Sequence, residues 1–336
     1  MHYECFSAEV LECTTAATTA ISTFKAKTVP PAPEPDHDPV TWPDIEWIPS
    51  YETYRQGVEI LAATADERPK SLPEGWPNEV NHPRAWAGSD FKSADDYVFK
   101  FTSEDIAEIE KALATFKVLL EEGRQSPDPD AVNRDTFPLP NLGPKLKEVS
   151  ATVHDGTGFS ILRGLDPSKY STLYNVLVYL GVTTYIADLR GCQDYDGRML
   201  VMPFHNDCCN ILSLYAYDVS AEGGESLLAS GAKIYNEIAA TRPDVIRLLA
   251  DDNWVFGEFH NGDYHKRPLL HQFSHGPGFV YSRRPLTGAW FSPHYPGVPA
   301  MTEEYAEALD MVHFTAEKHA LEVRLQRSSK WRVVSY

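Results

Sequence analysis

The residues His205, Asn206 and Asp207 place an imidazole and a carboxylate two positions apart. In an extended strand, residues two apart point to the same side, so these two side chains could bind one metal ion. Two histidines and one carboxylate on one side of the metal form the ligand set of non-haem Fe(II) enzymes, which leaves the remaining positions open for chemistry. Because the chain has 12 histidines, the alternative interpretation is a chance triplet at the surface or in a hydrogen-bonded pair.

The sequence around this triplet narrows the interpretation. After Asp207 come a strand-like run, the residues Gly223, Gly224 and Ser226 in the sequence GGES, and a helical segment. The flanking stretches are AWAGSDF (85–91), GFSILRGL (158–165) and YSRRPLTG (281–288). As a set in this order, they resemble the TauD/TfdA-like, clavaminate synthase-like oxygenases that depend on Fe(II) and 2-oxoglutarate, particularly the fungal members. The resemblance covers about residues 86–326.

The resemblance implies specific roles for three residues. His205 and Asp207 would supply two of the three Fe(II) ligands. Ser226 stands where relatives have a threonine that binds a carboxylate of the cosubstrate 2-oxoglutarate, and a serine hydroxyl keeps the same donor. The alternative for Ser226 is an ordinary hydroxyl at the start of a strand. The implied reaction uses O2 to hydroxylate or desaturate a small-molecule substrate.

The end of the sequence departs from this family pattern. Relatives place a second histidine, and then an arginine for the distal carboxylate of 2-oxoglutarate, after the segment that corresponds to LEVRLQR (321–327). Here the residues that follow are SSKWRVVSY (328–336), which match neither. We therefore expect a C-terminally incomplete domain without the final strands, and doubtful activity. A non-catalytic relative is the main alternative, and a metal enzyme that does not use 2-oxoglutarate is a third.

Arg283 and Arg284 are two further candidate site residues. A guanidinium can bind a carboxylate through two hydrogen bonds, so one of them could contact the substrate or 2-oxoglutarate. The alternative is an ion pair with an acidic neighbour, which we favour for one arginine while the role of the other stays open. The seven histidines at 260 and beyond lie outside the family context, and we expect them at the surface or at helix ends.

The elements that must position these residues follow from hydrophobic spacing. We predict an α+β fold with a mainly β core, a double-stranded β-helix or jelly roll with flanking helices. Residues 1–84 read as an N-terminal extension with a Pro-rich arm at 29–43, and residues 85–336 as the oxygenase domain. Helices are expected at 103–122, 142–153, 168–180, 234–240, 244–249 and 302–319. Strands are expected at 158–164, 210–217, 225–229, 254–259 and 278–282, with another starting at 321–327.

Composition limits the partners of this chain. Its 336 residues include 48 acidic and 30 basic side chains, for a net charge of -18, which argues against binding nucleic acid or an anionic membrane. No apolar run approaches the roughly 20 residues that span a bilayer. The first residues resemble neither a secretory signal nor a mitochondrial presequence, so we expect a cytoplasmic protein. The five cysteines include no CxxC pair, which makes a disulfide framework or a structural zinc site improbable.

Overall fold

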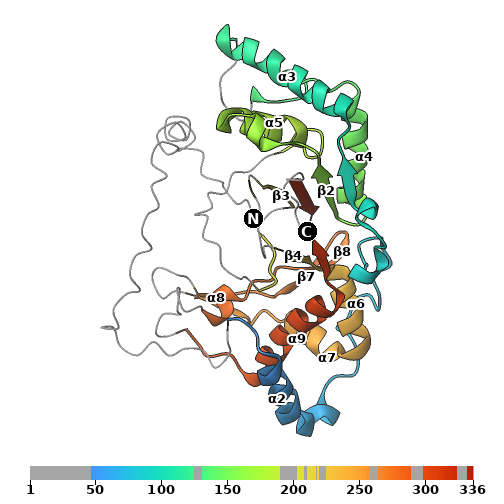
Figure 1. Cartoon of the computed structure of the whole chain (residues 1–336). Helices are drawn as coiled ribbons and strands as arrows, with labels where there is room; N and C mark the ends of the chain where they lie inside the picture. Colours follow the sequence, from blue (N-terminus) through green and yellow to red (C-terminus); the bar gives the residue numbers. More distant parts are fainter. Residues whose placement is uncertain are drawn as a thin grey trace, which may run out of the picture.

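The computed structural model describes residues 47–124, 131–189, 203–207, 210–216, 218, 225–257, 264–288, 298–323 and 331–335. The Pro-rich arm predicted at 29–43 lies outside these residues, as do Gly223 and Gly224. Within the described ranges, helices gather at two ends of the molecule and short strands lie between them (Figure 1).

The first hydrophobic core is built by α3 (Ser103–Glu121), α4 (Leu142–Asp155) and α5 (Thr172–Thr183). α3 begins at Thr102, whose hydroxyl accepts a hydrogen bond from the backbone N–H of Asp105, while the Asp105 carboxylate accepts one from the backbone N–H of Thr102. This reciprocal capping box fixes the start of the helix. Ile109, Leu113 and Phe116 then bury one face. The three helices predicted in this part of the sequence are confirmed.

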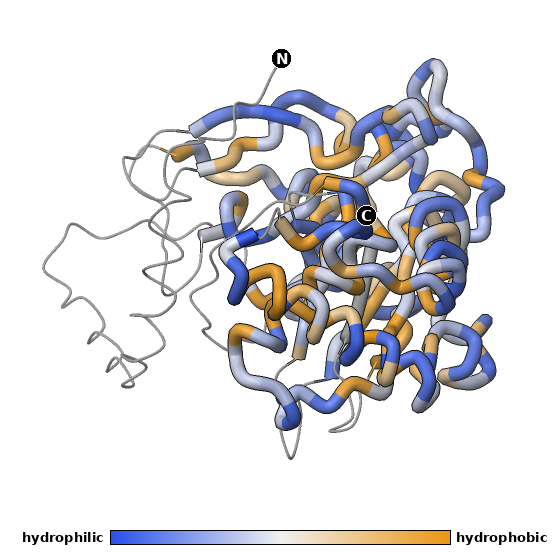
Figure 2. Tube along the Cα trace, turned by 90° about the horizontal axis from the view of Figure 1, so that it is seen from above, coloured by the Kyte–Doolittle hydropathy of each residue, from blue (hydrophilic) through white to orange (hydrophobic). Residues whose placement is uncertain are grey.

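The second hydrophobic core lies between α6 (Gly231–Thr241), α7 (Pro243–Leu249) and α9 (Glu303–His319), next to the short helix α8 (Arg284–Thr287). α2 (Tyr51–Leu61) and the 3-10 helix η2 (Ala62–Glu67) lie along α9 at the end of the molecule away from α3 (Figure 1). In Figure 2, hydrophobic and hydrophilic segments alternate along the helical windings, as expected for helices with one buried side.

The strands form four small sheets among the described residues. The largest has the order β1-β2-β10-β3, in which β1 pairs parallel with β2 and the other neighbours are antiparallel. The other three sheets are the antiparallel pairs β4–β9, β5–β6 and β7–β8. The bounds are β1 Val98–Lys100, β2 Phe159–Arg163, β3 Ile211–Tyr215, β4 Ser226–Leu228, β5 Val255–Gly257, β6 Tyr264–Lys266, β7 Leu270–Phe273, β8 Gly276–Phe279, β9 Leu321–Val323 and β10 Trp331–Ser335. The α+β class is confirmed, although the described sheets are smaller than a continuous jelly roll.

The last strand differs from what the sequence led us to expect. Residues 331–335 form β10, which pairs with β2 on one side and along its whole length with β3 on the other. Val333, for example, is opposite both Ser160 and Ser213. These residues therefore lie inside a sheet, and β2 and β3 are not left as bare edges on that side. The absence of further jelly-roll strands stays a prediction.

The described part of the predicted N-terminal extension packs against the second core. Leu72, Trp76 and Val80 contact its buried residues, and the hydroxyl of Tyr235 donates to the carbonyl of Pro77 at 2.6 Å. Residues 47–84 thus bury apolar surface together with α6 and α9. The domain boundary at residues 84 and 85 stays a prediction.

Candidate metal-binding site

His205 lies in an irregular segment, residues 203–207, where its side chain is exposed and Asp207 is half-buried. Nδ1 of His205 lies 2.9 Å from the carbonyl oxygen of Pro203. Because a carbonyl can only accept, Nδ1 must carry the proton, and the lone pair of the neutral ring then lies on Nε2. Metal-binding histidines are commonly oriented by such a bond from the second ring nitrogen. The bond to Pro203 therefore leaves Nε2 with its lone pair, and Asp207 lies two residues away.

Asn206, between the two candidate ligands, joins this segment to the YSRRPLTG stretch. Its backbone N–H donates to the carbonyl of Tyr281 at 2.8 Å, and its Oδ1 accepts from the backbone N–H of Tyr281 at 2.9 Å. The Tyr281 ring is buried, and its hydroxyl donates to the carbonyl of Leu309 on α9 at 3.0 Å. Burial raises the pKa of Tyr281 to about 12. Two motifs that the sequence singled out separately are thus in direct contact.

His313 on α9 lies close to the same segment. Its ring packs edge-on against Phe204, the residue before His205, with 5.3 Å between the ring centroids. Nδ1 of His313 is buried without a hydrogen-bond partner. Burial, and to a smaller extent the positive charge of Arg283, lower the pKa of His313 to about 4, so its ring is neutral at pH 7. No three His, Cys, Asp or Glu side chains among the described residues are grouped to hold a metal ion.

Ser226, the predicted contact of 2-oxoglutarate, is the first residue of β4. It is half-buried and lies opposite Val323 of β9 in an antiparallel pair. The hydroxyl therefore sits at a strand start, as both sequence interpretations require. The glycines that precede it in the GGES sequence lie outside the described residues.

The two candidate arginines have different environments. Arg283 is fully buried; its Nη1 lies 2.5 Å from Oδ1 of Asp310, and its Nε donates to the carbonyl of Trp47 at 3.1 Å. The ion pair that the sequence favoured for one arginine is therefore formed by Arg283. Arg284 is exposed at the first position of α8.

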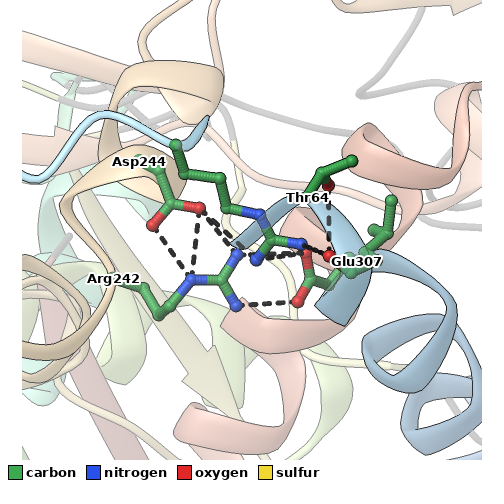
Figure 3. Close-up of polar contacts among 6 residues, drawn as sticks. Thr64, Arg242, Asp244 and Glu307 are labelled. Atoms are coloured by element: carbon green, nitrogen blue, oxygen red, sulfur yellow. Dashed lines mark hydrogen bonds and ion pairs between the residues drawn. The ribbon is translucent and has the colours of Figure 1, made fainter. Parts of the chain in front are cut away.

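A second group of charges, part-buried between η2, α7 and α9, was not predicted from the sequence (Figure 3). Nη1 of Arg242 lies 2.7 Å from Oε1 of Glu307, and Nη2 of the same side chain lies 2.7 Å from Oδ2 of Asp244. Arg68 approaches both carboxylates at 3.7 to 3.8 Å and donates to the carbonyl of Leu61. This network ties η2 to α7 and α9, and no local sequence pattern marks its members.

A cleft of about 200 Å³ opens beside this network, between α2 and α9. Its lining includes Tyr54, Met301, Glu307 and Asp310 but none of residues 203–207. Both carboxylates already form ion pairs with arginines. The cleft is therefore separate from the predicted metal ligands.

Comparison with known proteins gives the family. Residues 122–329, more than half of the chain, match the family described as "Taurine catabolism dioxygenase TauD, TfdA family". The chain belongs to this family. The taurine hydroxylase-like protein SAT17 of Stachybotrys chartarum is 33% identical over 273 residues, which cover 72% of this chain and 69% of that protein. The resemblance inferred from the sequence motifs is thereby confirmed, and Fe(II) and 2-oxoglutarate are the cofactors of this family.

One solved structure of low sequence identity shares the fold, and a second is less similar. An asparagine oxygenase in complex with Fe(II), 2S,3S-3-hydroxyasparagine and succinate superposes with a TM-score of 0.52 at 14% identity, covering 71% of this chain and 85% of that one. The non-heme iron oxygenase OrfP, in complex with Fe, succinate and a dihydroxy-arginine, reaches a TM-score of 0.38 at 10% identity, covering 71% and 84%. Only the first likeness is strong enough to support a common fold. No helix of the described residues is long and apolar enough to cross a bilayer.

Proposed function

We propose that this chain is an Fe(II)- and 2-oxoglutarate-dependent oxygenase that hydroxylates or desaturates a small-molecule substrate. The observation that carries the proposal is the environment of His205. In a chain of the TauD, TfdA family, the bond from its Nδ1 to the Pro203 carbonyl leaves Nε2 available, two residues from the Asp207 carboxylate. An imidazole nitrogen and a carboxylate oxygen are the donor types that non-haem Fe(II) prefers.

Four residues of the chain have proposed roles in this reaction. His205 and Asp207 would hold the metal, and the Ser226 hydroxyl would donate to a carboxylate of 2-oxoglutarate. Arg284, exposed at the start of α8, stays a proposed contact for a carboxylate of the substrate or cosubstrate, and the guanidinium of Arg283 is bonded to Asp310. When bound, Fe(II) with 2-oxoglutarate and O2 supplies the oxidising power that breaks a C–H bond; the protein supplies position and a shielded site.

An anaerobic titration with Fe(II) and 2-oxoglutarate tests this proposal through the visible metal-to-ligand charge-transfer band. We expect a saturable band in the wild type and its loss in His205→Ala. His265→Ala is the matched control, since His265 is exposed on β6, which pairs with β5, and is not part of the triplet; it should keep the band. A band that persists unchanged in His205→Ala would contradict the assignment.

A non-catalytic relative is the second candidate function. It is favoured by one observation: the described residues contain no group of three side chains arranged to hold a metal ion. A folded wild type without the band, together with a regained band in a chimera that carries a relative's segment after residue 327, would favour this candidate. If the wild type does form the band, release of succinate over a panel of small acids that includes taurine would identify the substrate class.

A further inference from the structure

We propose that Asn206 is a positioning residue that fixes His205 and Asp207 to helix α9 before any metal binds. The inference rests on the proposed metal role of the two flanking residues. It concerns the middle residue of the triplet, whose side chain the motif itself leaves unspecified.

Two hydrogen bonds join Asn206 to Tyr281. In an antiparallel strand pair, two opposite residues can form two hydrogen bonds, each from the N–H of one residue to the carbonyl of the other. Here the backbone N–H of Asn206 donates to the carbonyl of Tyr281, but the reciprocal acceptor is the side-chain Oδ1. The amide oxygen thus replaces a backbone carbonyl, and a segment without regular strand structure gains a two-bond attachment. An alanine at this position would keep only one of the two bonds.

Tyr281, the residue that Asn206 contacts, is itself held in place. Tyr281 is 4% exposed, and its hydroxyl donates to the Leu309 carbonyl on α9. Two residues along, Arg283 forms the buried pair with Asp310, also on α9. The stretch 281–283 is therefore attached to α9 at two points. Because Asn206 forms two hydrogen bonds with Tyr281, α9 also fixes the position of Asn206.

On the other side of His205, Phe204 also attaches the segment to α9. The Phe204 ring packs against His313 of α9 and contacts the second core. With Phe204 and Asn206 both held, the backbone of His205 lies between two fixed residues, and Asp207 directly follows one of them. Ligands that are ordered in advance lose less conformational entropy on binding. Removal of groups that orient metal ligands commonly weakens metal affinity by 10- to 100-fold.

The test compares Asn206→Ala and Asn206→Asp with a matched control, Asn236→Ala. Asn236 of α6 makes a similar two-bond clamp on a different segment: its Oδ1 accepts from the backbone N–H of Val80 at 2.7 Å, and its Nδ2 donates to the Val80 carbonyl at 3.0 Å. Three quantities are measured on the full chain. They are amide hydrogen exchange of residues 204–207 and 281 without metal, the dissociation constant for Fe(II) or Mn(II) under anaerobic conditions, and the thermal midpoint.

We expect Asn206→Ala to speed exchange at residues 204–207 and at Tyr281, and to weaken metal affinity by about tenfold or more. Asn206→Asp keeps the Oδ1 acceptor and should restore slow exchange; because its added carboxylate can itself attract a cation, it is judged on exchange. Asn236→Ala should lower the thermal midpoint and leave both other quantities unchanged. That contrast separates positioning from a general loss of stability.

Unchanged exchange at 204–207 in Asn206→Ala would overturn the proposal, and so would equal weakening of metal affinity by Asn236→Ala. Failure of the proposed function looks different, because the wild type would then show no metal binding that depends on His205. In that case the exchange comparison still decides whether Asn206 holds the segment, and the metal-positioning role itself is refuted.

Discussion

Asp310→Asn is expected to destabilise the protein strongly because it removes one charge of a buried ion pair. The side chains of Arg283 and Asp310 are 0% and 6% exposed, and the joined atoms lie 2.5 Å apart. Asparagine keeps the shape of aspartate but takes the negative charge away from a guanidinium that water cannot reach. Breaking a buried pair by neutralising one partner costs about 3–5 kcal/mol of unfolding free energy. We expect a loss of this size.

Urea unfolding at pH 7, followed by circular dichroism, measures this loss, and the chain offers a control with the same geometry at the surface. Lys100 and Asp95 also lie 2.5 Å apart, but their side chains are 58% and 73% exposed. Asp95→Asn is the same chemical change at the same distance, and solvent screens an exposed pair. We expect no measurable shift of its urea midpoint.

Burial is the cause in this reasoning, so two results would refute it. One is an Asp310→Asn protein within about 1 kcal/mol of the wild type; the other is an Asp95→Asn protein that is destabilised as much as the Asp310 variant. The double variant Arg283→Met with Asp310→Leu adds a further check. Replacing both buried charges by apolar groups is often neutral, so this protein should be more stable than Asp310→Asn alone.

Three further predictions follow from the described residues. Burial lowers the pKa of His313 from its ordinary value of 6.5 to about 4, so the unfolded state takes up the proton first and stability falls as the pH drops from 6.5 to 4. Urea unfolding across this range should show a loss of up to about 3 kcal/mol in the free energy of unfolding that is missing in His313→Phe. Thr102→Ala removes the capping hydroxyl of α3 and should lower the free energy of unfolding by about 1 kcal/mol. In Gly181→Ala the new methyl group would overlap the Phe137 ring and should lower the free energy of unfolding by about 1–3 kcal/mol. In Gly57→Ala no atom lies near the new methyl group, and the free energy of unfolding should rise by about 0.5–1 kcal/mol. Calorimetry of the two variants tests these opposite signs.

The sequence predicted those elements whose signal is local. The span 103–122 was predicted as a helix because its apolar residues recur at helical spacing, and α3 ends within one residue of that range. The strand at 158–164 contains β2, whose residues are almost all buried. The family likewise followed from motifs that are contiguous in the chain. The helix and the strand needed only residues close to one another in sequence, and the family needed only the order of such short motifs along the chain.

The contacts that hold the site depend on residues far apart in sequence. Asn206 and Tyr281 are 75 positions apart, and nothing in either motif states that they touch. Residues 51–61 were assigned to the N-terminal extension, and no helix was predicted there. None of the residues of α2 is buried; its place is set by the rings of Tyr51 and Tyr54 against Phe314, which lies far along the chain. The strand β10 was missed for the same reason, since its partners β2 and β3 lie more than 100 residues earlier.

Helix α9 shows why such long-range contacts constrain a sequence that looks merely amphipathic. Residues 307, 310 and 314 recur at spacings of three and four, so they lie along one side of the helix, where they meet Arg242, Arg283 and the aromatic rings of α2. On a neighbouring side of the helix, the backbone carbonyl of Leu309 accepts from Tyr281 and the ring of His313 packs against Phe204. One side therefore receives the two arginines and α2, and the other receives Tyr281 and the segment that carries the candidate metal ligands. Hydrophobic spacing predicts that the helix exists. Which charged and aromatic residues it carries depends on partners that are distant in sequence, and no local pattern predicts those partners.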